Sequence, residues 1–89
     1  MIAWESKEIK MKMYSVMGPT PGDGSVQKAE DHFTAFCKHL YLDYNEDKNF
    51  EHFKERVRIM VDANKSHTVK VSETQTNFGD YEVKEVQSN

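Results

Sequence analysis

The sequence predicts an α+β domain in which an αα-hairpin packs on one face of a three-stranded antiparallel sheet. Three observations lead to this class: an alternating segment near the start, two apolar rows at helical spacing in the middle, and a second alternating region that folds back on itself. The expected order of elements is β-α-α-β-β. The sequence leaves open which strand of the C-terminal hairpin lies beside the first strand.

Residues 7–17 alternate between two kinds of side chain, which is the period of a strand with one covered face. The residues expected to face the helices are Ile9, Met11 and Met13. Those expected to face solvent are Lys10, Lys12 and Tyr14. Residues 18–25 hold three of the four glycines and both prolines, so we expect an irregular loop there.

Residues 25–64 carry the apolar rows of the two helices. The first row is Val26, Ala29, Phe33, Phe36, Cys37, Leu40, Tyr41 and Tyr44. The second row is Phe50, Phe53, Val57, Met60 and Val61. Ser25 is the expected N-cap of the first helix, which extends to about Tyr44. Asp47 or Asn49 is expected to cap the second helix, and Asn64 to end it.

The C-terminal hairpin is expected to pair residues 68–76 with residues 81–87. We prefer a four-residue loop over 77–80, because it gives one apolar and one oppositely charged cross-strand pair. These pairs are Val71 with Val86 and Glu73 with Lys84. The alternative is a two-residue loop at Gly79 and Asp80, which places Thr74 opposite Glu85.

The length of 89 residues suits one core, so we expect a single domain over residues 1–89 with residues 1–6 and 87–89 frayed. Only 37% of the residues are apolar and the mean hydropathy is −0.82, which predicts modest stability. Twelve basic against fifteen acidic residues give a net charge of −3, too weak a field to attract nucleic acid non-specifically. Most acidic residues lie beside a basic one, a mixed pattern that also argues against a DNA mimic.

The sequence predicts a cytoplasmic protein without a membrane partner. No apolar run reaches the roughly 18 residues that would span a bilayer. Residues 1–8 lack the basic and apolar regions of a secretion signal. The lone cysteine, Cys37, lies in an apolar helical row and fits a reducing compartment.

The acidic joint between the helices resembles half of a calcium-binding loop. Asp43, Asn45 and Asp47 fall at positions one, three and five, but Lys48 replaces the glycine at six and Lys54 the glutamate at twelve. Because a cation at the last ligand position repels the ion, we interpret this segment as a helix-capping connector. A calcium-responsive helix pair remains a weaker alternative.

Other chemistry is not predicted, and neither a metal nor a cofactor is expected. His32 and His39 lie seven residues apart, about 10.5 Å along a helix, which is too far for one zinc ion. Gly22 to Ser25 open the first predicted helix but lack a phosphate-binding motif, and Asp23 adds a negative charge. Burial of Cys37 would raise the pKa of its thiol, the reverse of what a nucleophile needs. We therefore expect no enzymatic activity.

What remains is a contact surface with aromatic side chains that have no obvious place in the core. The candidate binding residues are Trp4, Lys10, Lys12, Tyr14, Phe78 and Tyr81. They favour a small protein-binding module, an inhibitor or adaptor acting on a larger protein, and a homodimer is an open possibility. Phage-encoded inhibitors of host machinery share this size and composition, an association rather than a resemblance. The alternative is a domain that binds single-stranded nucleic acid through the same lysines and tyrosines.

Overall fold

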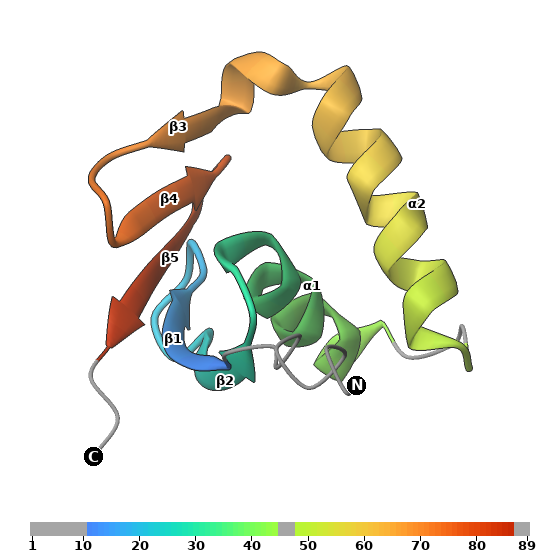
Figure 1. Ribbon diagram of the computed structural model, residues 1–89, viewed down its shortest axis with the longest axis horizontal. Helices are drawn as coiled ribbons and strands as arrows, with labels where there is room; N and C mark the ends of the chain where they lie inside the picture. The colour runs from blue at the N-terminus through green and yellow to red at the C-terminus, as the bar shows by residue number, and fades with distance from the viewer. Residues whose placement is uncertain (1–10, 45–47, 87–89) are drawn as a thin grey trace, which may run out of the picture.

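The computed structural model describes residues 11–44 and 48–86, and its chain forms one antiparallel sheet with both helices on the same side (Figure 1). The elements are β1 (Lys12–Met17), β2 (Gly24–Ala29), α1 (His32–Asp43), α2 (Phe50–Ala63), the short 3-10 helix η2 (Lys65–His67), β3 (Thr68–Lys70), β4 (Gln75–Phe78) and β5 (Tyr81–Val86). The five strands lie in the order β2-β1-β5-β4-β3. The predicted α+β class is confirmed. The predicted three-stranded sheet is wrong, because two strands were not expected.

Strand β2 is the first unexpected strand, and it occupies the segment that was predicted to begin the first helix. The turn before it closes through hydrogen bonds from the Gly18 N–H to the Asp23 carbonyl and from the Asp23 N–H to the Thr20 carbonyl. The chain then returns alongside β1 as a hairpin. Helix α1 begins only at His32, where the Asp31 side chain accepts from the Thr34 N–H at 2.7 Å. Ser25 is therefore a strand residue and not a cap.

The prediction assigned the two faces of β1 the wrong way round: Tyr14, which was expected to face solvent, lies on the helix side. Tyr14 and Val16 are 2% and 0% exposed and lie under the helices, whereas Met17 is 55% exposed on the opposite face. Their partners in β2 are Gln27 and Ser25, which lie on the same face of the sheet. The prediction placed Ile9, Met11 and Met13 on the helix side. Of these three, Ile9 is outside the described residues.

The C-terminal region contains the second unexpected strand, because residues 68–76 are split into β3 and β4. Tyr81 pairs with Phe78, and Lys84 pairs with Gln75. This register leaves Gly79 and Asp80 as a two-residue turn. The preferred four-residue register is thus wrong and the alternative is confirmed. Gly79 has φ 64°, a conformation that favours glycine and a tight hairpin turn.

The two residues expected to pair across the hairpin lie instead in the connection from β3 to β4. Val71 is 53% exposed, and Glu73 forms an ion pair with Lys70 at 2.9 Å rather than with Lys84. That ion pair lowers the pKa of the Glu73 carboxyl through a hydrogen bond and the charge of Lys70.

The core lies between α1 and the sheet. Phe36 of α1 stacks on Phe78 of β4, with ring centroids 4.7 Å apart and an interplanar angle of 9°. The buried apolar residues of the core are Tyr14, Val16, Ala29, Ala35, Phe36, Cys37, Phe53, Val57, Phe78 and Val83. Helix α2 starts and ends as predicted, capped by Asn49 and stopping at Asn64, but contributes only Phe53 and Val57 to this core. Figure 1 shows α2 standing away from the sheet, with η2 leading from it into β3.

Candidate functional site

A groove lies among the described residues between α2, the end of α1 and the β4-β5 turn. Its volume is about 530 Å³. The residues that line it are Phe36, Leu40, Tyr44, Phe53, Arg56, Val57, Met60, Val61, Asn64, His67, Thr68, Phe78, Gly79 and Tyr81. A mostly apolar hollow with a few polar groups is the usual form of a binding site for an apolar ligand or side chain.

The groove forms because α2 packs against the rest of the domain mainly through two buried residues, Phe53 and Val57. The apolar row of α2 continues past Phe53 and Val57 to Met60 and Val61, so it is longer than the surface that α1 covers. Met60 consequently remains 64% exposed. The sequence placed these residues in the core because periodicity reports which face of a helix is apolar but not how closely another element approaches it.

Polar groups on the groove wall are basic or neutral. They include the Arg56 guanidinium, the Asn64 amide and the His67 imidazole, and none of the lining residues is a carboxylate. Tyr81 contributes its ring, which meets Phe36 edge-on at 5.3 Å between centroids. Burial, and secondarily the charge of Asp23, raises the pKa of the Tyr81 phenol, so this hydroxyl is neutral and can donate a hydrogen bond.

Two of the six predicted binding residues, Phe78 and Tyr81, line the groove. Trp4 and Lys10 are outside the described residues. Tyr14 is buried beneath α1, so the argument that it is a spare surface aromatic fails. Phe78 is 8% exposed and is likewise a core residue that contributes only one side to the groove. The four predicted residues that the structure describes, Lys12, Tyr14, Phe78 and Tyr81, therefore do not share one exposed surface.

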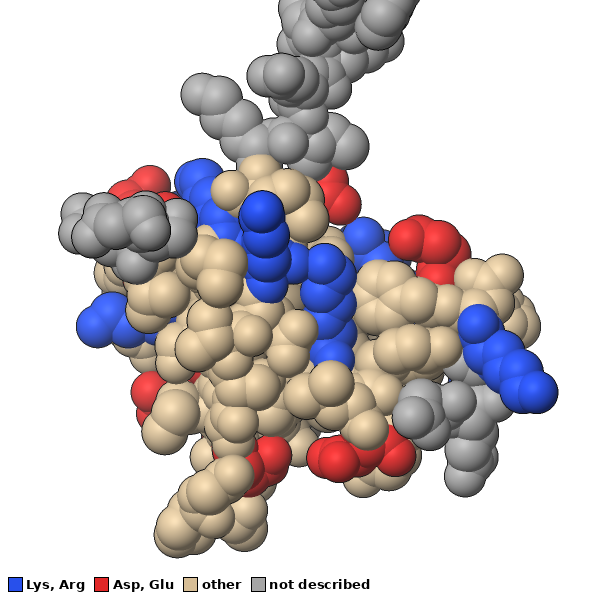
Figure 2. All heavy atoms as spheres, turned by 90° about the horizontal axis from the view of Figure 1, so that it is seen from below, with Lys and Arg blue, Asp and Glu red and all other residues tan. Residues whose placement is uncertain are grey.

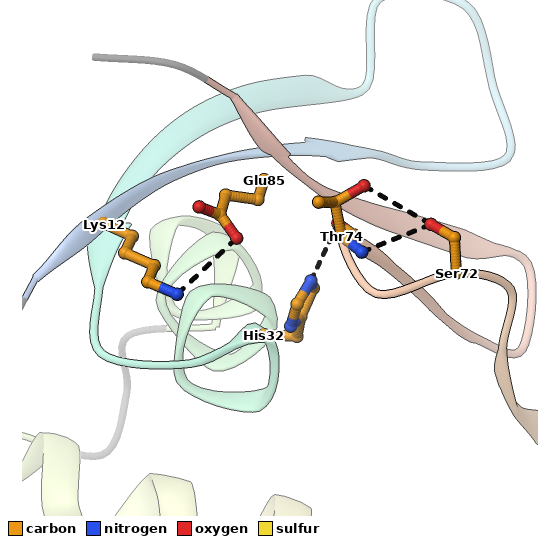
Figure 3. Close-up of polar contacts among 5 residues, drawn as sticks. All are labelled: Lys12, His32, Ser72, Thr74 and Glu85. Atoms are coloured by element: carbon orange, nitrogen blue, oxygen red, sulfur yellow. Dashed lines mark hydrogen bonds and ion pairs between the residues drawn. The ribbon is translucent and has the colours of Figure 1, made fainter.

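Lys12 lies at the other end of the sheet, in the polar cluster drawn in Figure 3, where its Nζ is 3.7 Å from a carboxylate oxygen of Glu85. In the same cluster the His32 Nε2–H donates to the Thr74 carbonyl at 2.9 Å. The Thr74 N–H in turn donates to Ser72 Oγ at 3.2 Å. These contacts fasten the β3-β4 connection to the start of α1.

The ring of Tyr14 lies beside this cluster, 4.6 Å from the His32 ring between centroids. Its pKa is raised by burial and then by the nearby Glu85 and Asp31 carboxylates. The buried ring of Tyr14 therefore packs at one end of the core and has a structural role.

A partly buried chain of hydrogen bonds joins Ser25 and Asp23 through His39, a combination that sequence spacing did not reveal. Ser25 Oγ is 2.7 Å from His39 Nδ1, and His39 Nε2 is 3.1 Å from Asp23 Oδ1. The Gln27 amide also donates to Ser25 Oγ at 2.9 Å. The hairpin between β1 and β2 creates this arrangement, so no local signal could have predicted it.

These groups have the residue types of a hydrolytic triad but not its arrangement. The serine meets Nδ1 instead of Nε2, and the imidazole is only 4% exposed. Both ring nitrogens are already engaged, and the buried ring has little room beside it for a substrate. We interpret the chain of hydrogen bonds as a tie between the loop 18–23, β2 and α1.

The other candidate groups are the Cys37 thiol and the acidic joint between the helices. Burial raises the pKa of the Cys37 thiol to about 12, so the thiol is protonated at neutral pH. Within residues 11–44 and 48–86, no group of three or more His, Cys, Asp or Glu side chains is arranged to hold a metal ion. The predicted calcium-type joint includes residues 45–47, which are outside the described part. No helix in the described part has the length and apolar character needed to cross a membrane.

Surface charge is mixed where it can be viewed directly. Figure 2 shows basic side chains grouped in the middle of one face, with acidic side chains next to them and along its rim. Two of the ion pairs join Lys12 to Glu85 and Lys54 to Glu30. Such interspersed charges do not form a continuous basic track for a phosphate backbone.

Comparison with known proteins gives no further guide: no family model matches the chain, and no significant similarity is found among curated proteins or solved structures.

Proposed function

We propose that this protein is a small non-enzymatic protein-binding module that holds an apolar, acid-bearing segment of a larger protein in the groove beside α2. Binding of that segment would make the protein an inhibitor or an adaptor of the complex to which the segment belongs. A cytoplasmic location remains a prediction.

The observation that carries the proposal is a mostly apolar groove whose own lining residues include no carboxylate. Aromatic and aliphatic walls favour burial of apolar side chains, at roughly 25 cal/mol per Å² removed from water. The lining residues include a guanidinium and an imidazole, whereas the carboxylates of Asp23, Asp43 and Asp80 lie near Tyr81. A segment with an Asp or Glu beside its apolar anchors is therefore complementary to the side of the groove that Arg56 lines. An amphipathic helix is the simplest ligand of this kind.

The nucleic-acid alternative gains no specific support. The stacking surface that it required depended on Tyr14, which is buried, and on Lys12, which is paired with Glu85. The proposal is therefore restricted to a protein partner.

The proposal is tested by selection from a displayed library of random 12-residue peptides on the immobilised full chain. We expect enriched peptides with apolar residues three or four positions apart and at least one acidic residue. A Met60→Glu variant should lose binding at least tenfold, because the new carboxylate enters the apolar wall. Ile59→Glu is the matched control, since Ile59 is 61% exposed on the same helix but does not line the groove.

Two outcomes would contradict the proposal. One is the absence of any enriched peptide on a chain whose circular dichroism spectrum shows it to be folded. The other is enrichment of peptides that bind Met60→Glu and Ile59→Glu equally well, which would place the contact elsewhere.

A further inference from the structure

Strand β2 forms one edge of the sheet, and hydrogen bonds elsewhere in the sheet establish which of its main-chain groups point outward. The Glu85 N–H of β5 donates to the Thr74 carbonyl at 2.7 Å, so odd-numbered β5 residues bond toward β4 and even-numbered ones toward β1. Carrying this alternation through the β1-β5 and β1-β2 registers makes odd-numbered β2 residues bond to β1. The N–H and C=O groups of Gly24, Val26 and Lys28 therefore point away from the sheet.

One contact confirms this direction and shows how little of the edge is covered. The Lys28 carbonyl accepts a hydrogen bond from Lys38 Nζ of α1, which is consistent only with an outward orientation. Among the described residues, the outward groups of Gly24 and Val26 have no hydrogen-bond partner. Val26 is also 57% exposed. A six-residue edge without proline is the type of strand that pairs with another chain.

The opposite edge of the sheet is different. Strand β3 has only three residues, and its pairing partners show that Thr68 and Lys70 point outward. The Thr68 N–H is already bonded to the Lys65 carbonyl of η2. A short strand with a lysine on its free side is a typical protected edge. The two edges are therefore not equivalent templates.

We propose that β2 pairs with β2 of a second copy of this chain, antiparallel about a two-fold axis through Val26, so that the sheet continues from one copy into the other. In this register Val26 faces Val26 of the second copy, and Gly24 faces Lys28 in both directions. All outward groups of the strand then find partners. The Lys28 carbonyl has a second lone pair, so it accepts the new bond without losing Lys38.

The side chains of the strand suit this symmetric pairing. The central pair joins two exposed valines, and each Lys28 lies opposite a glycine rather than another lysine, which avoids like-charge repulsion. On the helix side, Ser25 lies opposite Gln27 of the second copy, a pair that can form a hydrogen bond. Shifting the register by two residues would place Lys28 opposite Val26 and leave Gly24 beyond the paired strand.

This inference does not depend on the proposed function, but it affects it. The groove is bordered by α2, η2 and the β4-β5 turn, whereas β2 is the last strand at the other edge of the sheet (Figure 1). Pairing at β2 therefore leaves both grooves open. A dimer would offer two identical binding sites and bind bivalent targets with higher avidity than a monomer.

The interface is tested first by measuring the molar mass of the full chain by sedimentation over a range of concentrations. We expect a reversible monomer-dimer equilibrium that Val26→Pro abolishes, because proline removes the central outward N–H without breaking a bond to β1. Lys70→Pro is the control, since it removes an outward N–H from the other edge and should leave the dimer intact. A wild-type chain that stays monomeric up to about 1 mM overturns the proposal. So does a dimer that survives Val26→Pro.

The register is tested by oxidation of single-cysteine additions, which also remains decisive if Val26→Pro fails to fold. Facing residues of a hydrogen-bonded antiparallel pair have Cα atoms about 5.5 Å apart, within disulfide range. Val26→Cys should therefore give a disulfide-linked dimer under mild oxidation, while the buried Cys37 does not react. Val69→Cys on the other edge should give none. Cross-linking of Gln27→Cys in preference to Val26→Cys would overturn the register, and equal cross-linking of Val69→Cys would overturn the interface.

Discussion

Helices α1 and α2 have apolar rows of similar length but opposite roles in this domain. Helix α1 lies across the sheet and buries five of its residues, which are Thr34, Ala35, Phe36, Cys37 and His39. Helix α2 buries only Phe53 and Val57, and its main neighbours are α1 and η2. One helix is therefore part of the core, and the other is attached to it.

The difference teaches that an apolar row can serve two purposes in one small chain. Around α1, the row is covered on the sheet side and supplies stability. Beside α2, the same kind of row is buried at Phe53 and Val57 and only partly covered at Phe50 and Val61. Its C-terminal part, with the exposed Met60, lines the groove. In a domain of this size, the incompletely covered residues of α2 are also those that line the groove.

The largest expected effect comes from truncating matched aromatic residues on the two helices. Phe36 and Phe53 are 7% and 8% exposed and both line the groove, but Phe36 stacks on Phe78 of the sheet, whereas the ring of Phe53 meets Tyr41 of α1. We expect Phe36→Ala to lower the free energy of unfolding by about 4 kcal/mol and Phe53→Ala by about 2 to 3 kcal/mol. Urea denaturation measures both, and equal losses would mean that the helices are anchored equally.

Alkaline pH should lower the free energy of unfolding, because the Cys37 thiol is buried in the core beneath α1. Burial is the main cause that raises the pKa of Cys37 in the folded chain to about 12 from its ordinary value of 9.0. Unfolding then releases a proton above pH 9, so the stability that is present below this pH is lost as the pH rises toward 12. The loss due to Cys37 is about 2 kcal/mol at pH 10.5.

The raised pKa values of Tyr14 and Tyr81 act in the same direction, so the contribution of the thiol needs a control. Urea midpoints of wild type and Cys37→Ala, measured at pH 8 and pH 10.5, isolate it as a difference. If both proteins lose the same stability between these two values, the thiol is more accessible than the structure indicates.

A smaller effect is expected from Val57→Ala, and amide exchange should show whether α2 opens independently of the rest of the domain. Val57→Ala removes about two buried carbon groups, a loss of about 1.5 kcal/mol. Because α2 has few buried residues, its amides should exchange with deuterium faster than those of α1 in wild type, through opening of α2 alone. Val57→Ala should accelerate exchange in α2 about tenfold. Equal protection of α1, α2 and β5 in wild type would show that the domain opens only as a whole.

The sequence predicted what its local patterns can encode. The second helix was predicted from Phe50 to the stop at Asn64 because its apolar row, its cap at Asn49 and its length agree. The strands at the two ends of the chain and the α+β class were also predicted. The start of α1 was not, because Val26 and Ala29 fit a helical spacing equally well as residues of β2, and only pairing with β1 decides between them.

The candidate site was less predictable for the same reason. The groove depends on the angle at which α2 leaves the core, which no periodicity records. The tie between Ser25, His39 and Asp23 depends on the β1-β2 hairpin bringing residues 14 and 16 positions apart into contact. Two predicted site residues, Phe78 and Tyr81, do line the groove, although they were chosen as surplus aromatics and not as members of a groove.

The smallest expected difference comes from the two helix caps. Asp31 Oδ1 accepts from the Thr34 N–H at 2.7 Å, and Asn49 Oδ1 accepts from the His52 N–H at 3.2 Å. Asp31→Ala should lower the free energy of unfolding by about 1 kcal/mol, because a short bond to a carboxylate also interacts with the helix dipole. Asn49→Ala should cost about 0.5 kcal/mol in the urea transition, since its bond is longer and α2 adds less to the core. Its main effect should be faster amide exchange in the first turn of α2. A larger loss for Asn49→Ala than for Asp31→Ala would reverse the ranking of the helices and make α2 the element on which the fold depends.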